Sequence, residues 1–114
     1  MNFANIQAEL VSKKEKKRVR DEYTSSLRKS FRLYATTLLA QHRLGIDIKD
    51  YEIHHIHPVS LGGSNKFSNL ALVKPDLHDE IHWLIDRETR GMERGDKRLI
   101  KIPYFNGHIW GLDI

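Results

Sequence analysis

Four histidines stand in two close pairs within the stretch from Glu52 to His82. His54 and His55 are adjacent, and His78 and His82 are four residues apart. Side chains with that second spacing lie on one face of an α-helix, about 40° apart around its axis, so they could grip one metal ion. A lone histidine is most simply a polar surface residue. The hypothesis of a functional site therefore depends on the four taken together.

Three of these imidazoles, from His54, His78 and His82, would make a catalytic metal site, because they leave positions open for water and a phosphate oxygen. Neutral nitrogen ligands favour zinc, nickel or a similar transition metal as the one divalent ion, with magnesium or manganese left open as ions for activity. His55 then remains free as a general base, since an unperturbed imidazole has a pKa of about 6.5. These parts predict phosphodiester hydrolysis.

The elements that must position the histidines are a strand, a loop, a second strand and a helix. Tyr51–His54 is a short strand, and it must end or bulge at His55 if both adjacent histidines are to serve one site. Gly62–Asn65 has the composition of a turn, and Asn69–Val73 is the second strand, which runs antiparallel to the first. A helix opens near Pro75, and the two histidines run along the edge of its buried stripe, Leu77, Ile81, Leu84 and Ile85.

Around this unit we expect a long N-terminal helix and a C-terminal β-hairpin, giving an α+β fold. Residues 1–11 carry no strong signal. A capping box at Ser12 and an apolar stripe predict a helix from Ser12 or Asp21 to about His42; the stripe is Leu27, Phe31, Tyr34 and Leu38. In the tail, Asn106-Gly107 favours a hairpin between residues 99–105 and 108–110, with Pro103 at a sheet edge.

Composition limits the classes of protein that fit. The 114 residues predict a single domain over 1–114, with a core unit at about 50–87 and a basic helical region at about 12–43. No apolar run approaches the ~20 residues of a membrane span, and the N-terminus lacks the apolar core of a secretory signal. There is no cysteine, so a metal site must use His, Asp or Glu.

The net charge of +4 is unevenly distributed. Six basic residues fall within eight positions, and such a cluster suits a polyanion such as nucleic acid, although a solvated helix face would have the same composition. The basic residues of this run are Lys13, Lys14, Lys16, Lys17, Arg18 and Arg20.

The stretch from Glu52 to His82 resembles the HNH, or ββα-metal, endonucleases. It is most similar to the DNase domains of colicins, S-type pyocins and related polymorphic toxins. The shared pattern is E-x-H-H-x(2)-P-x-S-x-G-G followed by N-x(8)-H-x(3)-H, and it covers about a quarter of the chain. The resemblance implies that His54, His78 and His82 bind the metal and that His55 is the general base. It also implies that Asn69 pins the loop and so fixes the His55 imidazole, and that Glu52 orients a ligand or a basic neighbour.

Two positions depart from the relatives. Where the colicin DNases carry a basic residue four positions before the glutamate, this chain has Ile48, which leaves Glu52 without that partner unless Arg43 or an N-terminal arginine replaces it. His57 stands where many members have lysine or another polar residue. It is a candidate for phosphate contact, an alternative ligand or an exposed side chain. The candidate nucleic-acid-binding residues are Lys16, Lys17, Arg18, Arg20, Arg28 and His57.

The expected function is that of a metal-dependent endonuclease acting on DNA with little sequence specificity, as the toxic domain of an antibacterial toxin. RNA stays open as a substrate, and an acidic inhibitor protein is an expected partner. The site of action is expected to be the cytoplasm, with delivery by a route other than a classical signal peptide left open. The alternatives are a stand-alone phage or defence nuclease and a metal-stabilised module that binds nucleic acid without cutting it.

Overall fold

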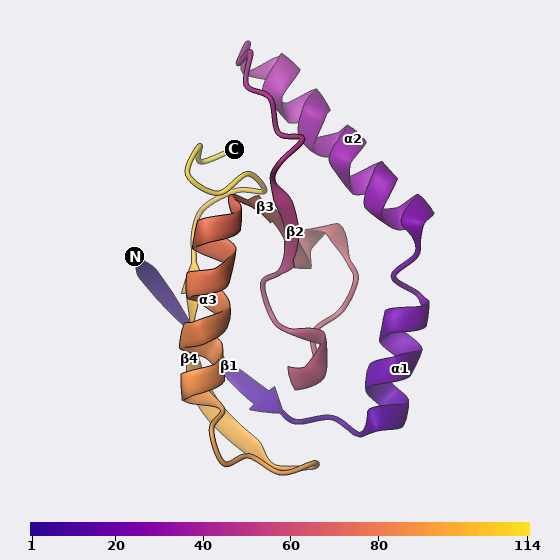
Figure 1. Ribbon diagram of the computed structural model, residues 1–114, viewed down its shortest axis with the longest axis vertical. Coiled ribbons are helices and arrows are strands. Elements are labelled where there is room, and N and C mark those ends of the chain that lie inside the picture. Colours follow the sequence, from indigo (N-terminus) through magenta and orange to yellow (C-terminus); the bar gives the residue numbers. More distant parts are fainter.

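The computed structural model describes residues 1–114 and has an α+β architecture. At its centre, β2 (Glu52–His55) and β3 (Leu70–Val73) form a two-stranded antiparallel sheet, and α3 (Pro75–Glu88) follows at once (Figure 1). The register pairs Glu52 with Val73 and His55 with Leu70. The predicted strand, loop, strand and helix are therefore confirmed, and with them the ββα unit.

Local chemistry explains where these elements begin and end. Pro75 occupies the first turn of α3, where its missing N–H costs nothing. After β2, a 3₁₀ turn at Val59–Leu61 ends at Gly62, which has a φ of 98°. Gly63 is required by space, because a Cβ there would lie 1.8 Å from the carbonyl oxygen of His57. The loop that leaves the histidine pair is thus folded tightly back on itself.

β3 is buried on both faces, although its sheet has only two strands. Ala71 and Val73 belong to one hydrophobic core, which lies between α3 and the sheet of β1 (Asn2–Glu9) and β4 (Lys97–Tyr104). The alternate residues Leu70 and Leu72 belong to a second core, against α2 (Ser25–Gln41). In Figure 1, β2 and β3 lie between α2 on one side and α3 with β1 and β4 on the other.

The N-terminal helical region differs from the single long helix predicted. α1 (Lys13–Asp21) ends before Tyr23, and α2 begins anew at Ser25. The reason is a second N-cap: the Thr24 hydroxyl accepts from the Leu27 N–H at 3.1 Å, as the predicted Ser12 cap does for Glu15 at the same distance. The apolar stripe of α2 is present, with Phe31 fully buried.

The predicted C-terminal hairpin is wrong. β4 pairs antiparallel with β1, from Asn2 opposite Tyr104 to Glu9 opposite Lys97, so the N-terminal residues that carried no signal form a strand. The segment after Gly107 turns away to β3 instead: the Leu72 N–H donates to the His108 carbonyl at 2.6 Å, and the Trp110 N–H donates to the Leu72 carbonyl at 2.9 Å. Pairing between the two ends of the chain leaves no local pattern, whereas Asn-Gly offers a local turn that the fold uses differently.

No helix of this structure combines the length and the apolar character that crossing a bilayer requires.

Candidate metal and catalytic site

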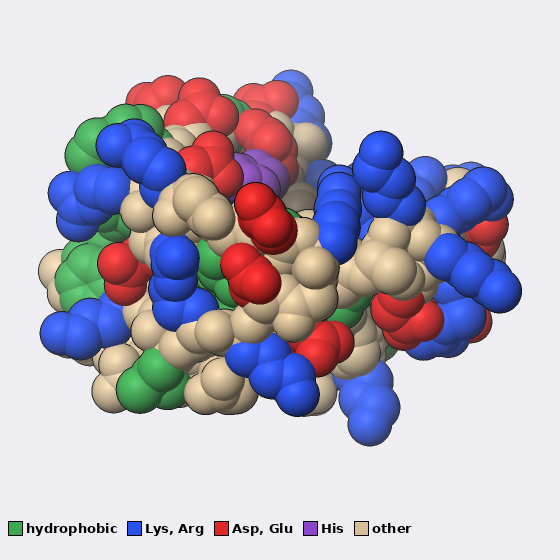
Figure 2. Space-filling view, turned by 90° about the horizontal axis from the view of Figure 1, so that it is seen from below, with side chains coloured by type: hydrophobic (Ala, Val, Ile, Leu, Met, Phe, Trp, Pro, Cys, Tyr) green, Lys and Arg blue, Asp and Glu red, His purple; other side chains and the backbone are tan.

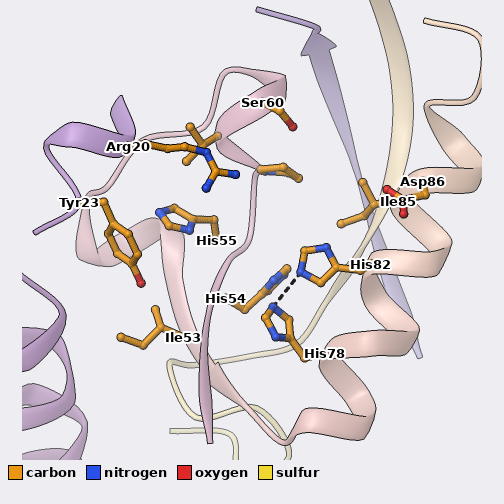
Figure 3. A pocket seen from close by; sticks show the side chains of 12 residues that line it. Arg20, Tyr23, Ile53, His54, His55, Ser60, His78, His82, Ile85 and Asp86 are labelled. Carbon is orange, nitrogen blue, oxygen red and sulfur yellow. Dashed lines mark hydrogen bonds between the residues drawn. The ribbon is translucent and has the colours of Figure 1, made fainter. Parts of the chain in front are cut away.

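Three of the predicted ligands converge. His54 comes from β2, and His78 and His82 come from successive turns of α3; one ring nitrogen from each lies within 4.8 Å of the others. Figure 3 shows the three imidazoles pointing toward one another. The Nε2 atoms of His78 and His82 are 2.9 Å apart. The i, i+4 spacing and the antiparallel register together produce this geometry.

His54 carries the clearest sign of a ligand. Its side chain is 2% exposed, and its Nε2 is buried without any hydrogen-bond partner. Burial lowers the pKa of His54 to about 3, with further lowering by His78 and His82, so the ring is neutral at pH 7. An unpartnered buried nitrogen is destabilising unless something binds it, and a metal ion would.

His78 is held by Glu52, whose Oε2 accepts from Nδ1 at 2.9 Å. Because an ionised carboxylate only accepts, Nδ1 carries the hydrogen and the Nε2 lone pair faces the cluster. Glu52 therefore contacts a candidate ligand rather than a basic neighbour, and no arginine forms an ion pair with it. Ile48, four residues before Glu52, is buried in the second core.

The donor set fits a transition-metal ion. Two nitrogens on one tetrahedral zinc lie about 3.3 Å apart, so donors already within 4.8 Å need only small movements to share an ion. Burial also lowers the pKa of His82, which favours the neutral ring that a metal requires. Three nitrogens leave the remaining coordination positions to water or substrate, as in a catalytic site.

His55 lies in the same cleft but outside the cluster, beside Tyr23 and Arg20 (Figure 3). Of the two predicted alternatives, an end or a bulge, the strand ends: His55 pairs with Leu70 as the last residue of β2, and the cleft extends around the end of the strand. Burial lowers the pKa of His55, against an opposing hydrogen bond from Asn65, so the imidazole is neutral at pH 7. A neutral imidazole can accept a proton.

Asn69 ties the loop together as expected. Its Oδ1 accepts from the His57 N–H at 2.8 Å, and its Nδ2 donates to the carbonyls of His57 and Ser64. It does not contact the His55 ring. That contact is made by Asn65, whose Oδ1 lies 2.9 Å from His55 Nε2, and sequence reasoning placed Asn65 only in a turn.

Comparison with known proteins adds one finding. The model of a family described as HNH endonuclease matches residues 42–86. We call residues 42–86 the HNH segment. It contains all four paired histidines together with Glu52, Asn65 and Asn69. It begins in the loop after α2 and therefore excludes β1, α1, α2 and β4. The curated proteins gave no match to the chain, and neither did the solved structures.

Basic residues from outside the HNH segment border the cleft. Arg20 lines it directly, and an adjoining hollow is formed by Lys13, Lys16, Lys17, Arg20, Asp21 and Arg94. A second hollow on the Tyr23 side is lined by Arg28, Lys29 and Arg32, with Glu52. Figure 2 shows Lys and Arg side chains gathered over the lobe that holds α1, and acidic side chains around the visible histidine.

The other predicted nucleic-acid contacts are engaged within the protein. Arg18 pairs with Glu15 at 2.7 Å and with Glu22 at 3.0 Å, and Lys17 pairs with Asp21 at 2.6 Å. These pairs are exposed, so a polyanion could replace them at little cost. Arg28 donates to the Tyr23 carbonyl at 2.8 Å. His57 is half-buried, and its Nε2 lies 2.6 Å from the Leu61 carbonyl oxygen. This contact stabilises the loop that follows β2.

Proposed function

We propose that this protein is a metal-dependent HNH endonuclease that hydrolyses phosphodiester bonds of DNA. The observation that carries the proposal is one cleft in which His54, His78 and His82 converge while His55 remains outside the cluster with a ring nitrogen free. A closed structural site has no use for a neutral, unligated imidazole beside it, whereas hydrolysis requires a group that accepts a proton from water.

The roles of the residues follow from where they lie. His55 accepts the proton of the attacking water, and Glu52 keeps the His78 ring turned toward the cluster. Arg20 lines the cleft and would contact a phosphate oxygen. A divalent ion held by the three histidines would supply electrostatic stabilisation of the charge that develops on the phosphate and the departing oxygen. Asn69 maintains the loop between these groups.

The substrate is a nucleic acid that follows the two basic hollows, which meet the cleft at Arg20 and at Tyr23. Lysine and arginine contacts of this kind recognise phosphates and carry no direct sequence information, which supports cleavage with little sequence specificity. The choice of DNA over RNA rests on the family of the HNH segment. Binding should weaken steeply as salt concentration rises, because phosphate neutralisation releases counterions.

The central test is cleavage by chelator-stripped protein. Supercoiled plasmid and RNA are incubated with the protein while magnesium, manganese, nickel or zinc is added back singly. We expect nicking of the plasmid that depends on the added divalent ion and stops again with chelator. Inactivity with every ion, in protein shown to be folded by circular dichroism, would overturn the proposal and favour a metal-stabilised binding module.

We further propose that the domain acts as the toxic part of an antibacterial toxin in the cytoplasm of a target cell, where it would be opposed by an acidic inhibitor. The support is the toxin-like spacing of the histidine pairs and the basic surface. Expression of the wild-type chain in a bacterium should halt growth, and expression of His55→Ala should not. Harmless expression of protein that cuts plasmid after purification would favour a phage or defence nuclease instead.

A further inference from the structure

Asn65 links the His55 ring to helix α1 through both ends of its amide. Its Nδ2 lies 2.7 Å from the carbonyl oxygen of Val19, and its Oδ1 lies 2.9 Å from His55 Nε2. A backbone carbonyl can only accept, so the amide must present its NH₂ group to Val19 and its oxygen to His55. The orientation of the amide is therefore fixed by the fold.

That orientation determines which nitrogen of His55 carries the hydrogen. An amide oxygen accepts, so His55 Nε2 must donate, and in the neutral ring Nδ1 is then the nitrogen with the free lone pair. His55 Nδ1 has no hydrogen-bond partner within the chain. It is not buried either, because the only side-chain nitrogen or oxygen that is both buried and without a partner is His54 Nε2. His55 Nδ1 is consequently accessible to solvent, as a base that takes a proton from water must be.

The Val19 carbonyl is available because α1 stops where it does. In a continuous helix this oxygen would accept from the N–H of Tyr23, four residues on. Here the Tyr23 N–H donates to the Arg20 carbonyl instead, at 3.1 Å, and the Asn65 side chain satisfies Val19. Tyr23, released from the helix, packs edge-on against the His55 ring with centroids 4.7 Å apart. The break between α1 and α2 thus supplies both contacts that hold the His55 ring: the carbonyl that anchors Asn65 and the ring of Tyr23.

We propose that Asn65 is the positioning residue of the general base: anchored on the Val19 carbonyl, it holds His55 with hydrogen on Nε2 and keeps Nδ1 for the proton of the attacking water. This inference rests on the proposed function and deepens it. Asn65 itself contacts neither water nor phosphate in this scheme. It acts only through the orientation and tautomer of His55.

The experiment compares three variants in one loop. Asn65→Leu removes both hydrogen bonds at similar volume, Asn65→Asp keeps an acceptor for His55, and Ser68→Ala alters an exposed residue without a side-chain partner. The readouts are kcat and KM for plasmid cleavage, zinc affinity, and the ¹⁵N shifts of the His55 ring, assigned by difference from His55→Ala. ¹⁵N shifts distinguish a protonated from an unprotonated ring nitrogen.

We expect Asn65→Leu to lower kcat about 10- to 100-fold, the loss usual for an orienting partner, with KM and zinc affinity unchanged. Asn65→Asp keeps the acceptor for His55 but cannot donate to the Val19 carbonyl, so it should retain the Nε2–H signature with a kcat between those of Asn65→Leu and the wild type. Ser68→Ala should match the wild type. Wild-type kcat in Asn65→Leu would overturn the proposal. If that variant fails to fold, the wild-type spectrum still decides, because hydrogen on His55 Nδ1 would also overturn it. Failure of the wild type to cleave with any metal would instead remove the proposed function, while the tautomer remains measurable.

Discussion

The cleft has two halves that are assembled in different ways. The metal half, His54, His78 and His82 with Glu52, comes from β2 and α3, which lie close together in the chain inside the HNH segment. The base half, His55 with Asn65, Tyr23 and Val19, joins that segment to the break between α1 and α2, through a hydrogen bond between residues 46 positions apart in the sequence, Val19 and Asn65. The metal half is a local motif, whereas the base half exists only once distant parts of the chain have packed.

The largest expected effect separates the two halves directly. His55→Ala should lower plasmid cleavage by about 10²- to 10⁴-fold, the usual contribution of a general base, while zinc binding persists. His82→Ala should abolish tight zinc binding and cleavage together, because it removes one of three ligands. The measurements are initial rates of nicking and isothermal titration with zinc. Loss of zinc binding and of folding in His55→Ala would mean that the base half is a structural part of the metal site.

The same contrast explains what could be predicted from sequence. His78 and His82 reveal their convergence through a helical period, and Gly63 and Asn69 fall in a motif whose backbone needs them. Asn65 gives no such signal, because its partner Val19 is far away in the chain and an asparagine beside two glycines looks like turn chemistry. The β1–β4 pairing was invisible for the same reason, since contacts between distant segments leave no periodic trace.

A pH titration examines the metal half without its metal. In the folded protein the pKa of His54 is lowered to about 3, whereas in the unfolded chain it returns to about 6.5. Below about pH 6.5, His54 therefore binds a proton in the unfolded state but not in the folded state, and the free energy of unfolding falls as pH falls. Between pH 7 and pH 5 the loss from His54 alone should be about 2 kcal/mol. The pKa values of His55 and His82 are lowered too, so their contributions have the same sign.

Urea unfolding of chelator-stripped protein at pH 7, 6 and 5 measures this loss. His54→Leu serves as the matched variant, and its free energy of unfolding should depend less on pH over this range. Excess zinc should make the pH dependence of the wild type steeper, because protons and metal compete for the same nitrogens. A wild-type stability that stays level from pH 7 to pH 5 would contradict the buried, neutral state of His54.

The smallest expected effect lies in the base half, at the residue that creates the break between the helices. Thr24→Ala removes the acceptor of the Leu27 N–H and should cost about 1 kcal/mol of stability, a typical value for an N-cap. Ser26→Ala, at an exposed position of the same helix without a side-chain hydrogen bond, is the control.

Losing the cap also favours continuation of α1 through Tyr23, which would return the Val19 carbonyl to the helix and loosen Asn65. We therefore expect kcat to fall a few-fold in Thr24→Ala, less than in Asn65→Leu, with zinc affinity unchanged. If stability falls and kcat does not, the Thr24 cap stabilises the fold without affecting the base, and the hydrogen bond between Asn65 and the Val19 carbonyl does not depend on that cap.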